Sequence, residues 1–150
     1  RGLGDVYKRQ IYKMDKIQDS EIETLLKMTN NESTQIITQE FIEDIYEGDF
    51  RILIIHGKPF KKTLARIPQG DSFKGNLAAG GKGVVKDISD LQFEMASEIG
   101  DFLIQKDINF AGIDVIGNFL TEINVTSPTC ARQILDQSGE NPIQEYFEKL

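Results

Sequence analysis

The stretch FRILIIHGKPFKKTLARI, residues 50–67, decides the fold of this 150-residue chain. Its first part, Phe50–Ile55, and its last part, Lys61–Ile67, are rich in the β-branched and apolar residues that favour strands. The tetrapeptide HGKP at residues 56–59 lies between them and is a short, glycine-containing connection. Such a connection between two apolar runs is typical of a hairpin. The stretch therefore predicts two antiparallel strands joined by a tight turn.

Helices and a second hairpin are expected on either side of these strands. The runs Phe110–Ile116 and Phe119–Val125 flank Gly117-Asn118 and predict the second hairpin. Two further strands are expected, one ending at Ile11–Met14 and one buried at Gln35–Ile42. Three helices are expected: one capped at Asp19-Ser20 and ending at Asn30-Asn31, an amphipathic one from Asp90 to about Lys106, and a terminal one over 142–149. Helices mixed with antiparallel hairpins indicate the α+β class.

Composition limits the partners and the compartment. The net charge is −7, whereas a protein that neutralises a nucleic-acid backbone needs a basic face, so no nucleic-acid partner is expected. Apolar runs are all shorter than the roughly 18–20 residues that a membrane span requires, so no membrane partner is expected either. The single cysteine, Cys130, rules out an internal disulfide framework and fits a reducing cytoplasm.

The stretch DVIGNFLTEIN, residues 114–124, carries the densest group of oxygen ligands. If Asp114 and Glu122 lie on the two strands of a hairpin, they can face each other on one side of the sheet. Asn124 lies two residues beyond Glu122, so its side chain points to the same side. Two carboxylates and an amide oxygen suit a hard cation such as Mg²⁺. The alternative is the exposed polar face of an ordinary hairpin.

A glycine-rich segment, Pro68–Gly83, joins the first hairpin to the helix that follows. Its length exceeds that of an ordinary connection, and long loops of this kind are often active-site lids. Its spacing matches neither a Walker A loop nor a dinucleotide-binding fingerprint. A disordered surface loop is the alternative interpretation.

Arg51 and Arg66 occur on the two strands of the first hairpin, and Lys74 and Lys82 occur in the glycine-rich segment. A guanidinium group binds two oxygen atoms at once, which makes arginines in an acidic chain candidates for carboxylate or phosphate recognition. The alternatives are solvated strand positions or structural ion pairs. His56 is expected at the surface, and Cys130 has no neighbouring histidine that would make it a nucleophile.

Three stretches together resemble the bacterial glutathione synthetases: LARIPQG at 64–70, GNLAAGGKG at 75–83 and LTEINVTSPTC at 120–130. The resemblance covers roughly residues 11–150. It implies an ATP-grasp fold, present here in part, in which ATP lies between two α+β subdomains. The implied activity is the ligation of glycine to γ-glutamylcysteine, with cleavage of ATP to ADP and phosphate. The implied partners are ATP, γ-glutamylcysteine and glycine, and the full-length protein is expected to be a homo-oligomer.

The resemblance also implies roles for individual residues. Arg51 and Arg66 would be catalytic, facing the substrate carboxylates and the transferred phosphate, and the segment from Ile67 to Lys82 would close over the acyl phosphate. The implied ligands of Mg²⁺ or Mn²⁺ are Asp114, Glu122 and Asn124. The implied nucleotide-binding residues are Gln39, Glu40, Phe41, Ile42, Asp49, Lys74 and Lys82. The implied substrate-binding residues are Asn124, Val125, Thr126, Ser127 and Thr129.

Residues 1–10 depart from the family pattern. A family member carries a Lys-Pro-Leu-Asp-Gly-x-Gly-Gly segment in this place, whereas the chain reads RGLGDVYKRQ. We therefore expect residues 1–10 to be a non-native junction, residues 11–150 to be the C-terminal part of an ATP-grasp domain, and the fragment alone to be weakly active or inactive. The rival interpretations are another ATP-grasp ligase, such as a peptide or D-alanine ligase, a non-catalytic nucleotide-binding or interaction domain, and a structural α+β domain without a ligand.

Overall fold

A computed structural model describes residues 11–150, so the expected junction at residues 1–10 lies outside the described residues. The chain divides into two compact units, one ending at Phe41 and the other formed by Ile42–Leu150. None of the helices within the described part is long and apolar enough to cross a membrane.

The first unit contains one helix, α2 (Asp19–Met28), within residues 11–41. Gln18 rather than Asp19 is its N-cap and forms a capping box with Glu21. The strands expected at Ile11–Met14 and Gln35–Ile42 are wrong, because both segments are irregular and Ile37 is 88% exposed. β-branched residues favour a strand only where a neighbouring strand pairs with them, and this unit supplies none among its described residues.

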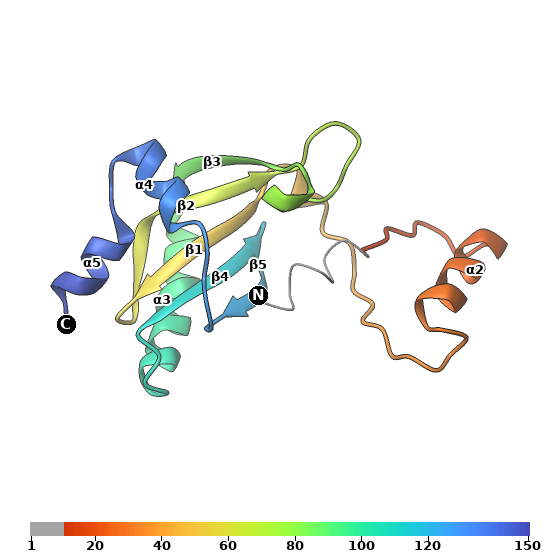
Figure 1. The fold of residues 1–150 in the computed structure, drawn as a ribbon, viewed down its shortest axis with the longest axis horizontal. Coiled ribbons are helices and arrows are strands. Elements are labelled where there is room, and N and C mark those ends of the chain that lie inside the picture. Colours follow the sequence, from red (N-terminus) through yellow and green to blue (C-terminus); the bar gives the residue numbers. More distant parts are fainter. Residues whose placement is uncertain (1–10) are drawn as a thin grey trace. The chain divides into compact units, whose positions relative to one another are not determined.

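The second unit is built on a five-stranded antiparallel sheet with the order β3-β2-β1-β4-β5 (Figure 1). Both predicted hairpins are confirmed: β1 (Asp49–Ile55) pairs with β2 (Lys58–Ile67), and β4 (Phe110–Ile116) pairs with β5 (Phe119–Asn124). The fifth strand, β3 (Lys82–Asp87), is not expected from the sequence and pairs with the outer edge of β2. This short sequence, KGVVKD, has only two apolar residues, so its periodicity is weak.

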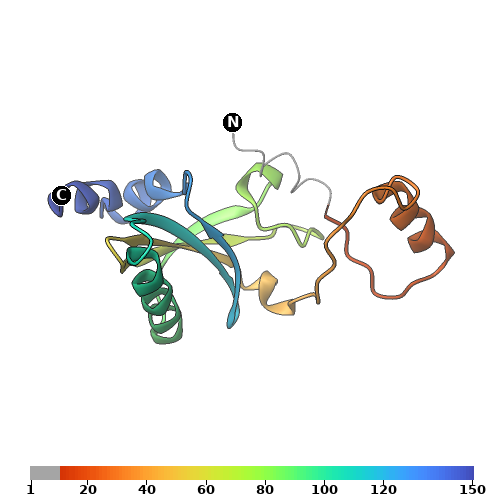
Figure 2. The same cartoon turned by 90° about the horizontal axis from the view of Figure 1, so that it is seen from below.

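Helices cover both faces of the sheet (Figure 2). The long helix α3 (Asp90–Ile104) packs on one face, where Ile52, Ile54 and Ile113 are buried against Ala96 and Leu103. The opposite face carries α4 (Ala131–Ser138), whose Ile134 is buried with Leu53, Ile55, Phe60 and Leu64. The terminal helix α5 (Pro142–Glu148) begins with proline in its first turn, as predicted. The second unit also contains two short 3₁₀ helices, η2 (Glu43–Tyr46) and η3 (Leu77–Ala79). The α+β class is confirmed.

Side chains along β1 alternate between the two faces of the sheet, and this alternation determines which face its polar residues occupy. Ile52 and Ile54 point toward α3, while Leu53 and Ile55 point toward α4. Because side chains two residues apart share a face, Asp49 and Arg51 lie on the face that carries α4. The apolar residues fill the part of this face beneath the C-terminal helices, and Asp49 and Arg51 occupy its other end.

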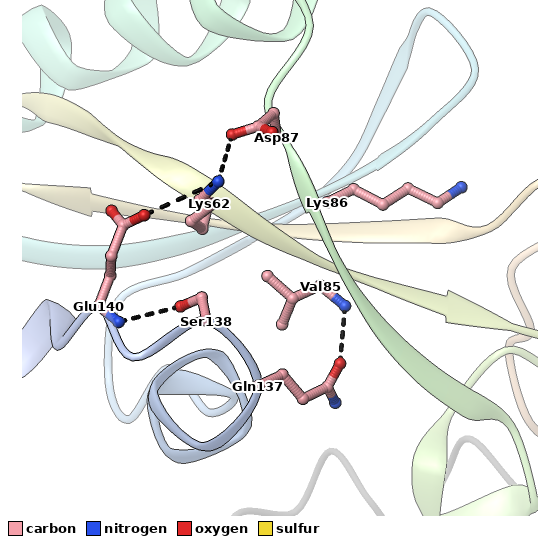
Figure 3. A pocket seen from close by; sticks show the side chains of 7 residues that line it. All are labelled: Lys62, Val85, Lys86, Asp87, Gln137, Ser138 and Glu140. Atoms are coloured by element: carbon pink, nitrogen blue, oxygen red, sulfur yellow. Dashed lines mark hydrogen bonds and ion pairs between the residues drawn. The ribbon is translucent and has the colours of Figure 1, made fainter.

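The outer edge of β3 is paired with a side chain of α4. The Gln137 amide oxygen accepts a hydrogen bond from Val85 N at 2.9 Å, and its amide nitrogen donates to Gly83 O at 3.2 Å. Gln137 therefore takes the place of a further strand at this point, which protects an otherwise open sheet edge. It also lines a surface hollow of about 260 Å³ with Lys62, Val85, Lys86, Asp87, Ser138 and Glu140 (Figure 3).

Replacing Gln137 by leucine is expected to speed hydrogen exchange at the Val85 amide and to destabilise the fold by about 1 kcal/mol, because both edge hydrogen bonds are lost. Gln137→Glu is the matched control, since it keeps the acceptor for Val85 N and loses only the donor to Gly83 O. Exchange measured residue by residue distinguishes the two variants. Unchanged protection of Val85 in the leucine variant would show that Gln137 does not hold this edge.

Candidate active site

Strand pairing brings the predicted polar residues onto one face of the sheet. Asp49 on β1 is the register partner of Arg66 on β2, and Arg51 on β1 is the partner of Asp114 on β4. Asp114 is in turn the partner of Glu122 on β5, as the spacing of the second hairpin predicted. The site thus extends over four adjacent strands.

Four of these residues form a buried ion-pair network. The Asp114 carboxylate accepts hydrogen bonds from Arg51 Nε and from Arg51 Nη2, the latter at 2.9 Å from Oδ2. Arg66 Nη2 lies 2.8 Å from Asp114 Oδ2 and 2.6 Å from Asp49 Oδ2. The network contains two guanidinium groups and two carboxylates, so its formal charges balance.

Burial makes this balance necessary. The side chains of Arg51, Arg66 and Asp114 are only 3%, 6% and 2% exposed. Burial alone would raise the pKa of Asp114, but the hydrogen bonds and charges of the two arginines outweigh it, and the pKa of this carboxyl group lies below its ordinary value. Burial would likewise lower the pKa of Arg66, but Asp49 and Asp114 raise it instead. All three side chains are therefore charged at neutral pH.

The segment after β5 lies against Arg51. Arg51 Nη1 donates to the Thr129 hydroxyl at 3.4 Å. Gly112, on the neighbouring strand β4, leaves room for this arrangement, because a Cβ atom there would lie 2.9 Å from Pro128 Cβ and 3.0 Å from Arg51 Cδ. The predicted substrate-binding segment 124–129 therefore adjoins one of the two predicted catalytic arginines.

The glycine-rich segment borders the other arginine. A Cβ atom at Gly75 would lie 2.5 Å from Arg66 O, and one at Gly81 would lie 2.0 Å from Gly75 O. Both approaches exclude any larger residue. The turn that contains η3 closes on itself between these glycines, and Leu77 packs against the apolar cluster below α4. The loop is shorter than predicted, because Lys82 and Gly83 already belong to β3.

The ligands predicted for Mg²⁺ or Mn²⁺ lie on adjacent strands. Asp114 and Glu122 are register partners, and Asn124 is paired with Gly112, two residues before Asp114. Hard oxygen donors of this kind suit either cation. Within residues 11–150 no group of three His, Cys, Asp or Glu side chains is close enough to hold a metal, so the set depends on the amide of Asn124. Its fit also depends on Asp114, whose two oxygens are both engaged by guanidinium groups.

The remaining predicted nucleotide-binding residues are distributed over both units. Gln39, Glu40 and Phe41 belong to the first unit, where the Phe41 ring lies 3.9 Å from Lys13 Nζ, and Ile42 precedes η2 at the start of the second unit. Lys82 is exposed at the start of β3, and Lys74 is half-buried in the loop. The surface hollow near Gln137 contains none of the predicted site residues.

His56 differs from its expected place at the surface. Its ring stacks on Tyr146 of α5 at a centroid distance of 4.9 Å, and Nε2 lies 2.9 Å from the Tyr146 carbonyl oxygen. The hairpin turn is thus packed against the C-terminal helix, so His56 contributes to the fold. The turn is tight because Gly57 has a positive φ of 76°.

Comparison with known proteins identifies the family and the fold to which the sheet with this ion-pair network belongs. The sequence profile described as "Prokaryotic glutathione synthetase, ATP-grasp domain" matches residues 3–139. The chain belongs to this family. Its five-stranded antiparallel sheet with flanking helices is accordingly part of an ATP-grasp fold, as the resemblance implied.

Three glutathione synthetases illustrate the similarity. The protein from Nitrosomonas europaea is 50% identical over 120 residues, which are 80% of this chain and 37% of that protein. The protein from Xylella fastidiosa strain Temecula1 is 45% identical over 82% of this chain and 39% of its own length. The protein from Bordetella pertussis is 39% identical over 97% of this chain and 45% of its own length. The chain thus spans about two fifths of the length of these relatives.

The ion-pair network of this ATP-grasp chain does not follow from any single sequence motif. The sequence leaves open whether Arg51 and Arg66 bind ligands or form structural ion pairs, and the structure shows that both form ion pairs with Asp114 and that Arg66 also pairs with Asp49. Thr129 is a predicted substrate-binding residue, and its contact with Arg51 is an additional finding. The signal that could have revealed the network is the pairing of β1 with β4, which places Arg51 opposite Asp114.

Proposed function

We propose that the full protein is a glutathione synthetase, which joins glycine to γ-glutamylcysteine with ATP. The observation that carries this proposal is the position of Arg51 and Arg66, buried side by side on one sheet face of a glutathione synthetase ATP-grasp domain. The loop containing Gly75 borders one arginine, and the segment containing Thr129 borders the other. A guanidinium group binds carboxylate and phosphoryl oxygens alike, so anionic substrate groups would bind here by replacing carboxylates of the network.

The proposed reaction has two steps. A carboxylate oxygen of γ-glutamylcysteine bonds to the γ-phosphorus of ATP, the bond to the β-phosphate oxygen breaks, and ADP leaves. The amine of glycine then bonds to the acyl carbon, phosphate leaves with the electrons of the broken C–O bond, and the amine loses a proton. Phosphoryl transfer depends chiefly on positioning and on neutralisation of charge. A bound Mg²⁺ or Mn²⁺ ion would neutralise phosphate charge.

The side chains of this chain divide these tasks. Arg51 and Arg66 would bind the reacting carboxylate and the transferred phosphoryl group and offset the negative charge that develops on them. Asp114, Glu122 and Asn124 would hold the cation. Residues 39–42, with Asp49, Lys74 and Lys82, would bind the nucleotide, and residues 124–127 with Thr129 would line the pocket for the peptide and glycine. We further propose that the full protein is a cytoplasmic homo-oligomer.

Product analysis tests this proposal. The full protein is incubated with ATP, MgCl₂, γ-glutamylcysteine and glycine, and glutathione, ADP and phosphate are quantified. We expect the three products in equal amounts. Ligation of other amino acids in preference to glycine would identify another ATP-grasp ligase. A rise in melting temperature with ADP and Mg²⁺, but without any ligation product, would instead indicate a nucleotide-binding domain.

Shortening the glycine-rich loop is expected to raise ATP hydrolysis relative to glutathione formation. An acyl phosphate reacts readily with water, and the proposed lid would exclude water from it. Gly75 and Gly81 are already in contact, so deletion of residues 76–80 rejoins neighbouring residues. The measurement is the ratio of phosphate to glutathione released, with Asp71→Asn as a full-length control. An unchanged ratio in the deletion variant would contradict the lid role.

A further inference from the structure

Asp114 has two competing tasks at this site. Its carboxylate is the shared acceptor of Arg51 and Arg66, with both oxygens engaged. The same carboxylate is also the proposed cation ligand on β4, opposite Glu122 on β5. A carboxylate held by two guanidinium groups is a poor ligand for a cation, because the positive charges repel the ion and occupy the oxygen atoms that would bind it.

The charge balance shows what must accompany a cation. Taking Asp114 away from the arginines leaves a buried positive charge without a counterion, which is strongly unfavourable. An oxyanion bound to the arginines would restore the balance. An oxyanion arriving alone would instead compete with Asp114 for the same N–H groups. Binding of the cation therefore raises the affinity of the site for the oxyanion, and binding of the oxyanion raises its affinity for the cation.

The two arginines differ in how firmly they hold Asp114. Arg51 donates through Nε and Nη2 to both carboxylate oxygens, which is the bidentate arrangement. Arg66 approaches through Nη2 alone, which lies 2.8 Å from one Asp114 oxygen and 2.6 Å from Asp49 Oδ2, so this atom has a second carboxylate partner. Arg66 is also tied to β1 through its Nε, which donates to Asp49 O at 3.3 Å. Arg66 Nη2 is thus the contact that can be exchanged at least cost.

We propose that Asp114 exchanges Arg66 for a divalent cation while Arg66 takes up an oxyanion, so that the cation and the oxyanion bind cooperatively. The inference rests on the proposed function for its two ligand classes. The oxyanion is a phosphoryl group or a carboxylate, since a guanidinium group binds either. Coupling between two ligands is reciprocal, so each must raise the affinity for the other by the same factor.

Binding of Mn²⁺ to the full protein, followed by electron paramagnetic resonance without turnover, tests this coupling. The titration is repeated with sodium sulfate, which stands in for a phosphoryl group, and with sodium acetate, which stands in for a carboxylate. Sodium chloride at equal ionic strength is the reference. We expect one of the two oxyanions to raise the Mn²⁺ affinity by about 5-fold or more. Salt that merely screens an acidic site lowers its affinity for Mn²⁺. A rise in Mn²⁺ affinity therefore distinguishes coupling from screening.

Variants then assign the coupling to Arg66. Arg66→Gln removes the group that takes up the oxyanion, and Arg66→Lys keeps the charge while losing the planar fork. Both are expected to bind Mn²⁺ with an affinity that no longer rises with the oxyanion. Arg132→Gln is the matched control, because Arg132 is 80% exposed in an ion pair with Asp136, and it should retain the full enhancement. Melting temperatures verify that each variant is folded.

The outcomes are decisive without a glutathione assay. Oxyanions that weaken Mn²⁺ binding or leave it unchanged in the unmodified protein would overturn the exchange, and so would an enhancement that persists in both Arg66 variants. The first of these results comes from the unmodified protein alone, so the exchange remains testable even if a variant unfolds. Coupled binding of Mn²⁺ and an oxyanion without glutathione formation would contradict only the proposed function. Glutathione formation without such coupling would contradict only the proposed exchange at Asp114.

Discussion

Replacing Asp114 by asparagine is expected to lower the free energy of unfolding by about 3–5 kcal/mol, which is the usual cost of removing one partner from a buried ion pair. The side chains keep nearly the same size, so the effect comes from charge. Two guanidinium groups would remain, with Asp49 as the acidic member of the network. Because small domains are stable by about 5–15 kcal/mol, this loss is a large part of the total. Urea unfolding followed by circular dichroism measures it.

An exposed ion pair provides the control for this prediction. Arg132 and Asp136 lie one turn apart on α4, and their side chains are 80% and 55% exposed. Asp136→Asn is therefore expected to change the unfolding free energy by less than about 1 kcal/mol. If Asp114→Asn costs no more than this control, the network does not contribute to stability in the way that its burial indicates.

Replacing Gly112 by alanine is expected to lower glutathione synthesis in the full protein by about 100-fold, since displacement of a reacting group by about 1 Å has an effect of this size. The added methyl group would lie 3.0 Å from Arg51 Cδ and 2.9 Å from Pro128 Cβ. Arg51 cannot move without disturbing its bonds to Asp114. The substitution therefore displaces either the arginine or the segment that carries Thr129. Steady-state kinetics with each substrate varied in turn measures the loss.

Gly83→Ala on β3 is the matched control. Its methyl group would meet the ends of two flexible side chains, Leu77 Cδ2 at 3.2 Å and Leu64 Cδ1 at 3.3 Å, so the neighbours can adjust. We expect a small change in melting temperature and nearly normal rates. Equal rates for Gly83→Ala and Gly112→Ala would show that the close approach at Gly112 does not position Arg51.

The elements that could be predicted are those with strong local signals. Both hairpins follow from dense runs of β-branched and apolar residues around a short turn, and α3 follows from its apolar periodicity. β3 and α4 do not emerge from the sequence because each is short, with six and eight residues, and is held in place by tertiary contacts. Gln35–Ile42 shows the reverse error: its residues favour a strand, but no strand pairs with them in the described part of the first unit.

The sequence by itself determined the α+β class, both hairpins, the family and the set of polar residues from which the candidate site is built. Only the tertiary structure decided how those residues use their charges. Arg51 and Asp114 are separated by 63 residues in the chain and meet because β1 pairs with β4, which no local pattern specifies. Once buried together, guanidinium and carboxylate groups must satisfy one another, because the cost of desolvation is too high for either to remain alone. The network at Asp114 is therefore a consequence of the sheet order, and so is the exchange of partners proposed for it.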